Sequence, residues 1–248
     1  DMSERKLRED YLPAYKAAVD SGCELVMTSF NTVDGIPASG NKWLMRNVLR
    51  EEWGFNGIII SDYAAIQELI AHGVAEDDRD AAKLGIEAGV DIDMKTPVYS
   101  NQLEGLVNDG VISEKLIDEA VWRILNLKNK LGLFENPYRG ADVSKEKSVI
   151  LSPEKLKLAR EISRESIVLL ENNGVLPISK DKKIAIIGPH GESKVLSGSW
   201  AINSNPDDVT SLVEAVKEKI SEENLMYAKG CEMTEDNSIL GGFGRAIE

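Results

Sequence analysis

The sequence predicts an α/β protein built from repeated strand and helix units. Three short apolar segments begin at residues 24, 57 and 90, which is 33 residues apart each time: Glu24–Phe30, Gly57–Ser61 and Val90–Met94. The segments between them have the apolar periodicity of helices. Because a connection between parallel strands needs a dozen or more residues and is usually a helix, this period indicates parallel strands.

Six helices are expected in the first half of the chain. They cover Ser3–Ser21, Lys42–Trp53, Tyr63–Ile70, Asp77–Ala88, Asn101–Asp109 and Ser113–Leu131. In the first, Pro13 starts a new turn or kinks the helix. In the second, Leu44, Val48 and Leu49 lie on one side. The fourth begins with acidic residues and is followed by Gly89, which suits the helix dipole and a C-cap.

A linker is expected after these helices, because Glu135–Ala141 is rich in Pro, Gly and Asn. The second half then reads as a helix, a strand, a helix and a strand, over Pro153–Asn172, Lys183–Gly188, Asp208–Ile220 and Leu225–Ala228. We therefore predict a first domain over residues 1–140, a linker over 141–152 and a second α/β domain over 153–248.

The composition is that of an ordinary globular protein, with 248 residues, 42% of them hydrophobic and 29% charged. The net charge of −13 and the lack of a basic stripe argue against nucleic acid as a partner. No apolar run approaches the roughly 18 to 20 residues of a membrane-spanning helix. We expect neither a nucleic-acid partner nor a membrane partner.

The number of repeats limits the architecture. A (β/α)8 barrel needs eight strands, and three strand–helix units cannot close one. If residues 1–140 are barrel-like, they form only the last part of a barrel. We therefore expect the chain to be an excerpt of a longer protein, with an exposed apolar patch that the remaining part of the parent chain or a second copy covers.

Asp62 is the first candidate for chemistry. It directly follows an apolar strand, and the carboxyl ends of parallel strands carry the catalytic groups of α/β folds. Asp is also a preferred N-cap, and a helix is expected from Tyr63 onward, so spacing alone leaves both interpretations open. Asp91 and Asp93 lie in and just after the third strand, where we expect one to face the strand ends and one a helix.

The order of several motifs points to a known family. The segments Met27–Asn31, Asp34–Pro37, Glu52–Phe55, Ile60–Tyr63 and Ala88–Met94 together resemble the nucleophile half of glycoside hydrolase family 3.

The second half resembles the same family. Gly132–Phe134 ends the barrel part as in those enzymes, and the later motifs Ser163–Leu170, Leu176–Pro177, Ile187–Pro189 and Gly198–Trp200 resemble the start of their α/β sandwich domain. The chain is most similar to the bacterial periplasmic-type β-glucosidases of the family. A periplasmic or extracellular location follows from that resemblance, and we expect any signal peptide to lie outside these residues.

The resemblance implies a retaining β-glycosidase that acts on a β-linked oligosaccharide or glucoside. Such enzymes use two carboxyl groups about 5 to 5.5 Å apart. Asp62 matches the nucleophile. The acid/base partner is a glutamate of the sandwich domain, and no motif for it occurs before Glu248. We expect the isolated chain to be inactive.

Three aromatic residues complete the implied site. Tyr63 and Trp200 match the aromatic side chains that hold the sugar at the leaving-group side. Phe30 stands where many members have Tyr, so it can pack beside the sugar but cannot donate a phenolic hydrogen bond. Without the resemblance, packing in a core or between domains would be the favoured explanation of Tyr63 and Trp200.

No cofactor and no metal are expected, because His72 and His190 lack nearby ligands at metal-binding spacing. Two other functions are weighed. One is a noncatalytic carbohydrate-binding or interaction fragment of such an enzyme. The other is a barrel aldolase or lyase, for which Lys95 at the end of the third strand is the candidate Schiff-base lysine.

Overall fold

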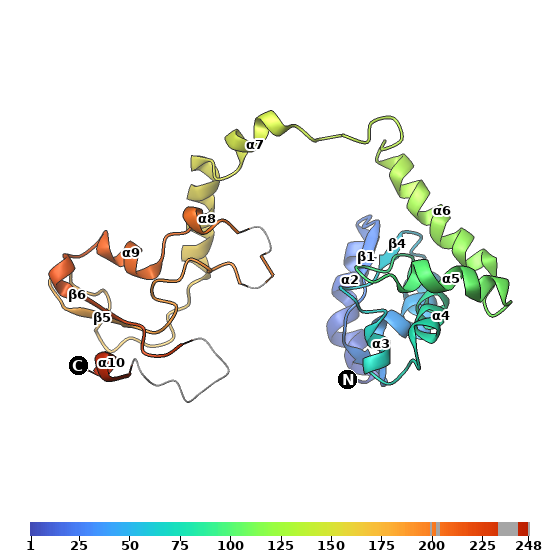
Figure 1. Ribbon diagram of the computed structural model, residues 1–248, viewed down its shortest axis with the longest axis horizontal. Helices are drawn as coiled ribbons and strands as arrows, with labels where there is room; N and C mark the ends of the chain where they lie inside the picture. The colour runs from blue at the N-terminus through green and yellow to red at the C-terminus, as the bar shows by residue number, and fades with distance from the viewer. Residues whose placement is uncertain (199, 202–203, 233–242, 248) are drawn as a thin grey trace. The chain divides into compact units, whose positions relative to one another are not determined.

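A computed structural model describes residues 1–198, 200–201, 204–232 and 243–247. The chain divides into two compact units, Asp1–Lys147 and Ser148–Glu248 (Figure 1). The division falls inside the segment predicted as a linker, although that segment also contains the short helix α7 (Val143–Val149).

The sheet of the first unit has two parallel strands, β1 (Leu25–Met27) and β4 (Ile58–Ile60). Their register pairs Leu25 with Ile58 and Met27 with Ile60. These strands confirm the first two strand predictions. Since parallel strands in register end at the same edge, the residues that follow β1 and β4 lie next to each other.

The third predicted strand is only a parallel bridge between Ile60 and Ile92. The N–H groups of Asp91 and Ile92 both donate to the carbonyl of Ile59, at 2.8 and 3.2 Å. Because two residues share one acceptor, the regular ladder stops there. The segment still runs beside β4, so the predicted order of the three segments holds.

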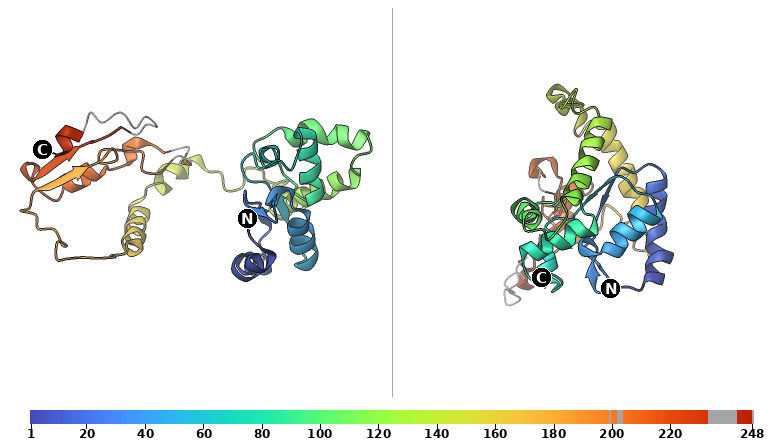
Figure 2. Two further views of the ribbon diagram at one scale, coloured as in Figure 1. Left: turned by 90° about the horizontal axis from the view of Figure 1, so that it is seen from below. Right: turned by 90° about the vertical axis from the view of Figure 1, so that its right-hand side faces the viewer.

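Helices surround this short sheet (Figures 1 and 2). The longer ones are η3 (Trp43–Glu52), α4 (Asp78–Ala88), α5 (Val98–Asn108) and α6 (Glu114–Lys130), close to the predicted positions. The helix predicted over residues 3–21 is confirmed and consists of three helical segments that follow one another without a break, α1 (Glu4–Lys6), the π-helical η1 (Leu7–Tyr11) and α2 (Leu12–Asp20). Pro13 lies in the first turn of α2, directly after the π-helical segment η1.

A small hairpin was not predicted. Strands β2 (Thr32–Val33) and β3 (Ile36–Pro37) pair antiparallel around Asp34 and Gly35, which have φ values of 54° and 76°. Asp-Gly is a favoured pair for such a two-residue turn. The turn leads into η2 (Ala38–Gly40).

The core of the first unit lies between the sheet and these helices. Ile59, Ile66, Leu69, Val90 and Val98 are almost completely buried. The apolar side predicted for η3 faces the same core, as Leu44, Val48 and Leu49 are buried. Burying such side chains stabilises the unit by about 1.5 to 3 kcal/mol each.

The second unit has one parallel pair, β5 (Ile184–Ile187) and β6 (Leu225–Ala228). Its helical segments are α8 (Pro153–Ser166), η4 (Pro206–Asp208), α9 (Leu212–Lys217), η5 (Glu222–Asn224) and α10 (Phe243–Ile247). Both strands confirm the prediction. The helix predicted over 208–220 is shorter, because a capping box of Ser211 and Glu214 starts α9 after the separate turn η4.

The helix predicted to reach Asn172 is also shorter than expected. Helix α8 ends at Ser166, and Ile167 has an extended backbone at ψ 122°. The next residue is Val168, and consecutive β-branched side chains favour extended backbone. Leu156, Leu158 and Ile162 on α8 are more than half exposed.

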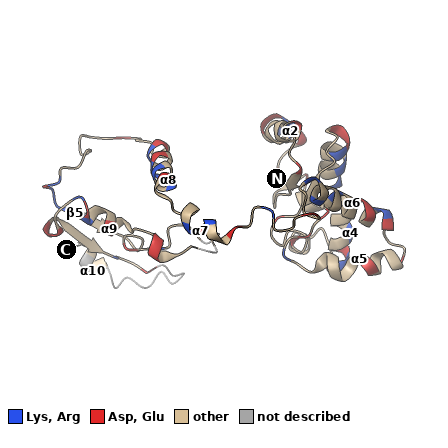
Figure 3. Cartoon of the chain, turned by 90° about the horizontal axis from the view of Figure 1, so that it is seen from above, with Lys and Arg blue, Asp and Glu red and all other residues tan. Residues whose placement is uncertain are grey.

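Charges are mixed along the helices (Figure 3). Several pairs lie one helical turn apart, such as Lys16 with Asp20 and Lys157 with Glu161. Exposed pairs of this kind contribute less than about 1 kcal/mol each. Within the described residues, no helix combines the length and the apolar character that crossing a membrane requires.

Candidate active site

Three chain segments meet at one edge of the first unit's sheet. The N–H of Thr28 after β1 donates to the carbonyl of Ile60 at 2.9 Å. The N–H of Ser61 after β4 donates to Ile92 at 2.9 Å, and that of Ala64 donates to Met94 at 3.0 Å. These bonds fix the strand ends against one another, and Asp62 lies among them.

Asp62 is half-buried and its backbone is held firmly. Its N–H donates to Oγ1 of Thr28 at 3.2 Å, and its carboxylate Oδ1 accepts the N–H of Tyr63 at 2.6 Å. Among the described residues, no hydrogen bond reaches Oδ2. One carboxylate oxygen is therefore oriented and the other is open to a ligand.

Asp62 does not cap a helix. The helix predicted over 63–70 is a series of turns followed by α3 (Glu68–Ala71), whose N-cap is Gln67. Ala64 has φ 62°, in the left-handed region, and this breaks the predicted helix directly after Tyr63. The N-cap interpretation of Asp62 is therefore wrong.

Three buried hydroxyl groups support the backbone around Asp62. Oγ1 of Thr28 lies 2.7 Å from Oγ of Ser39. Ser61 donates through Oγ to the carbonyl of Asp62 at 2.9 Å and accepts the N–H of Met94 at 2.8 Å. Sequence reasoning assigned these residues no role, although Thr28 and Ser61 lie within the motifs that carry the family resemblance. Nothing in the sequence signals Ser39.

Tyr63 and Lys95 lie together at this edge. Tyr63 is 45% exposed, and Nζ of Lys95 is 5.1 Å from the centre of its ring. An ammonium group over an aromatic face is a favourable contact. Lys95 is itself exposed. A Schiff-base lysine is activated by an apolar pocket or a second cation, and neither is seen around Lys95 in the described part of the chain.

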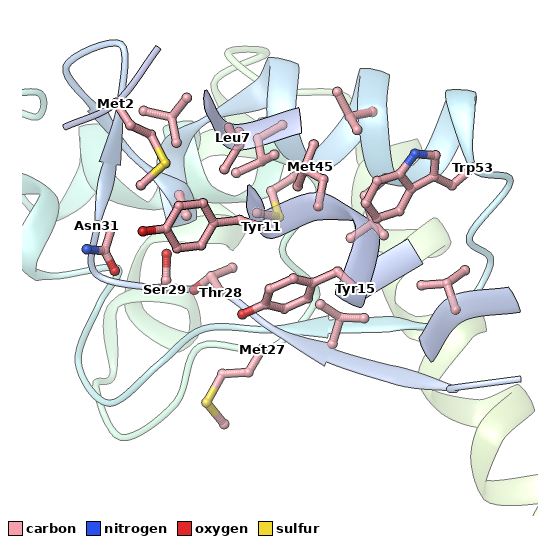
Figure 4. A pocket seen from close by; sticks show the side chains of 18 residues that line it. Met2, Leu7, Tyr11, Tyr15, Met27, Thr28, Ser29, Asn31, Met45 and Trp53 are labelled. Atoms are coloured by element: carbon pink, nitrogen blue, oxygen red, sulfur yellow. The ribbon is translucent and has the colours of Figure 1, made fainter. Parts of the chain in front are cut away.

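Phe30 follows β1 at the same edge and is 36% exposed. Its neighbours Thr28, Ser29 and Asn31 line a cavity of about 270 Å³ between β1, η3 and the segments η1 and α2. Tyr11 and Tyr15 also line this cavity (Figure 4). Phe30 is not among the residues lining it.

The other two acidic candidates have different environments. The carboxylate of Asp91 is completely buried and accepts bonds from Arg50 at 2.7 Å and Arg123 at 2.8 Å. It also accepts the N–H of Ile59 at 2.8 Å. Asp93 accepts from Thr96 at 2.7 Å, at the start of α5. Asp91 thus joins β4 to η3 and α6.

The buried charges around Asp91 alter nearby ionisation. Burial lowers the pKa of Arg50 to about 10; Asp91 opposes that shift and the neighbouring Arg123 adds to it. Burial also raises the pKa of Tyr99 well above its usual value, and the charges of Asp93 and Asp91 act in the same direction. The hydroxyl of Tyr99 donates to the carbonyl of Val90 at 3.0 Å.

Trp200 belongs to the second unit, where it lies in a turn and is 76% exposed. The preceding residue of its motif, Ser199, is outside the described residues. Within the described part of the chain, no three His, Cys, Asp or Glu side chains are grouped so as to hold a metal ion.

Two family models match the chain. The glycosyl hydrolase family 3 N-terminal domain matches residues 1–127, and the C-terminal domain of that family matches residues 167–240.

Curated relatives include a periplasmic beta-glucosidase of Salmonella typhimurium, 38% identical over 97% of this chain and 32% of the relative. A beta-xylosidase of Formosa agariphila is 36% identical over 100% of this chain and 36% of the relative. The chain thus spans about a third of the length of the curated relatives it matches.

Solved structures give the same result. A beta-glucosidase from Listeria innocua in complex with glucose is 46% identical, with a TM-score of 0.80 over 95% of this chain and 32% of that chain. The α/β fold of the chain is therefore similar to that of these hydrolases.

Proposed function

The chain belongs to glycosyl hydrolase family 3, and on that premise we propose that the full-length protein containing it is a retaining β-glucosidase with Asp62 as nucleophile. The environment of Asp62 carries the proposal. Its position at the carboxyl edge of the sheet, the bond that orients Oδ1 and the open Oδ2 are what an attacking carboxylate needs.

The reaction proceeds in two displacements. Oδ2 of Asp62 attacks the anomeric carbon, the bond from that carbon to the leaving-group oxygen breaks, and a general acid protonates that oxygen. Water then attacks the same carbon, gives its proton to the same group acting as base, and the bond to Asp62 breaks. The sugar is released with its β configuration. We place the acid/base in a part of the full-length protein outside this chain.

Tyr63, Trp200 and Phe30 are assigned to substrate binding. Sugar rings present C–H groups that pack on aromatic faces. The exposure of Tyr63 beside Asp62 supports a contact at the leaving-group side, and the assignment of Trp200 rests on the resemblance of its motif to the family. Phe30 packs beside the sugar without a polar contribution.

The substrate class follows from the relatives. Their names include beta-glucosidase and beta-xylosidase, and one Listeria innocua structure is a complex with laminaribiose, so we propose a terminal β-linked glucose as the sugar that is released. The name of the Salmonella typhimurium relative supports a periplasmic or extracellular location.

We further propose that the first unit is the C-terminal part of a (β/α)8 barrel and that the second begins an α/β sandwich domain. Support comes from the parallel β1 and β4 and from relatives three times as long. In the described residues β1 pairs only with β4, and Leu25 and Met27 are more than 40% exposed. The rest of the parent chain would cover this patch, and the isolated chain should be inactive.

Product stereochemistry tests the proposed function. The full-length protein would be mixed with an aryl β-glucoside, and an aryl β-xyloside in parallel, and the first anomer released would be followed by proton NMR. Rapid turnover of the glucoside with β-glucose appearing first supports the proposal. Release of α-glucose as the first product would contradict the retaining mechanism. Faster hydrolysis of the xyloside than of the glucoside would contradict glucose as the preferred sugar. Binding without hydrolysis would favour a noncatalytic carbohydrate-binding protein.

A further inference from the structure

Two residues beside Asp62 have a backbone conformation that is unusual for side chains other than glycine. Ala64 has φ 62° and Lys95 has φ 80°. They belong to different segments, which are joined by the bond from the N–H of Ala64 to the carbonyl of Met94 at 3.0 Å. Such a conformation is strained for a residue with a Cβ, and conformations of this kind cluster at functional sites.

At Lys95 this conformation accompanies a specific side-chain contact. Its Nζ lies 5.1 Å from the centre of the Tyr63 ring, while the lysine remains exposed. The adjacent Tyr63 follows Asp62 directly in the chain. The ammonium group therefore lies beside Tyr63 at the edge of the sheet that carries Asp62, and not inside the fold.

Of the nearby carboxylates, that of Asp93 is fully engaged by its own segment. Asp93, two residues before Lys95, accepts bonds from Thr96 on both oxygens and from the N–H of Tyr99. Oδ1 of Asp62 accepts the N–H of Tyr63. Among the described residues Lys95 forms no ion pair, so its charge is available to a bound molecule. The contact is notable in a chain with a net charge of −13.

We propose that Lys95 is a specificity-determining residue that favours substrates whose leaving group carries a carboxylate. The proposal rests on the proposed function, in which Tyr63 lies at the leaving-group side of the cleaved bond. An ammonium group over that ring meets the leaving group and not the transferred sugar. A carboxylate there gains an exposed ion pair that a neutral leaving group cannot form.

The test compares two glucosides in the full-length protein, 4-carboxyphenyl β-glucoside and its neutral counterpart 4-carbamoylphenyl β-glucoside. The measured quantity is the ratio of their kcat/KM values, so the intrinsic difference between the two leaving groups cancels between variants. In Lys95→Gly the ratio of anionic to neutral substrate should fall about fivefold, mainly through KM of the anionic one. Lys95→Arg should keep the wild-type ratio.

The variants separate specificity from folding. Glycine adopts φ 80° without strain, so Lys95→Gly should melt no lower than the wild type. Lys115→Met, which removes an exposed charge on α6, should leave the ratio unchanged. The fivefold effect should shrink as salt is raised.

An unchanged ratio in Lys95→Gly, with normal turnover of the neutral glucoside, would overturn the role of Lys95 and leave the proposed function intact. If the wild type hydrolyses neither glucoside, the proposed function fails and the role of Lys95 fails with it.

Discussion

Asp62 and Asp91 are two carboxylates on neighbouring segments of one small sheet, and their surroundings differ in every respect. Asp62 lies at the carboxyl ends of the segments and is half-buried, and among the described residues no hydrogen bond reaches its Oδ2. Asp91 is completely buried and is bonded to two arginines and a backbone N–H.

The difference separates reactivity from stability. A carboxylate whose bonding capacity is filled by the protein has none left for a substrate, whereas Asp62 is oriented but not saturated. In barrel-like α/β folds the carboxyl ends of the strands carry chemistry and the opposite side carries stability. Replacing Asp62 by Asn should therefore reduce activity and not stability, whereas the same replacement of Asp91 should reduce stability.

The largest effect is expected for Asp62→Asn in the full-length protein. Because an amide cannot form the glycosyl–enzyme, kcat on an aryl β-glucoside should fall on the order of 10⁴-fold or more. The amide oxygen can still accept the N–H of Tyr63, so the free energy of unfolding should stay within about 0.5 kcal/mol of the wild type. Asp118→Asn on α6 is the control and should keep full activity. Activity within tenfold of the wild type would show that Asp62 is not the nucleophile.

Asp91→Asn should act on stability instead. It leaves Arg50 and Arg123 buried beside a neutral amide, which should cost about 3 to 5 kcal/mol in the free energy of unfolding measured with urea. The matched control is Asp109→Asn, which breaks the exposed pair with Arg79 and should cost less than about 1 kcal/mol. Equal losses of unfolding free energy in the two variants would mean that the buried pairs of Asp91 stabilise the fold no more than an exposed pair does.

Thr28→Val tests whether the buried hydroxyls act on the site. The substitution keeps the shape of the side chain but removes the partner of the Asp62 N–H and of Ser39. We expect a loss of about 1 to 2 kcal/mol in unfolding free energy and a fall of about tenfold in kcat. Thr32→Val in β2 is the control. A loss of stability with an unchanged kcat would show that Thr28 stabilises the fold and does not affect catalysis.

The smallest effect concerns pH. The pKa of Tyr99 is raised in the folded state, so above pH 10 the unfolded chain ionises while the folded chain stays neutral, and stability is lost as pH rises. Between pH 8 and pH 11 the wild type should lose about 1.4 kcal/mol more than Tyr99→Phe. Tyr138→Phe, at a residue that is 79% exposed, should behave like the wild type. The same slope in all three proteins would show that Tyr99 is not responsible.

The sequence predicted the segments better than the contacts between them. Apolar patterning located β4 and η3, because both bury apolar side chains in the core. It could not show that Thr28 and Ser39 support Asp62, since that depends on the register of β1 against β4.

One expectation around the site is wrong and one was left open. A helix after Asp62 was expected from composition, but the left-handed backbone of Ala64 prevents it. The sequence also left open which of Asp91 and Asp93 faces the helices. Asp91 faces the helices because its carboxylate pairs with Arg50 and Arg123, which are distant from it in the sequence.

The most direct test of the account is peptide mass spectrometry of the full-length protein after treatment with a 2-deoxy-2-fluoro β-glucoside, which slows the second displacement and traps the glycosyl–enzyme. Trypsin separates the two carboxylates, since Asp62 falls in peptide 51–79 and Asp91 in peptide 84–95. The account predicts the added fluoroglucosyl mass on Asp62 and none on the peptide with Asp91. Hydrolysis of an ordinary glucoside with the label on another carboxylate, or with no label at all, would contradict it.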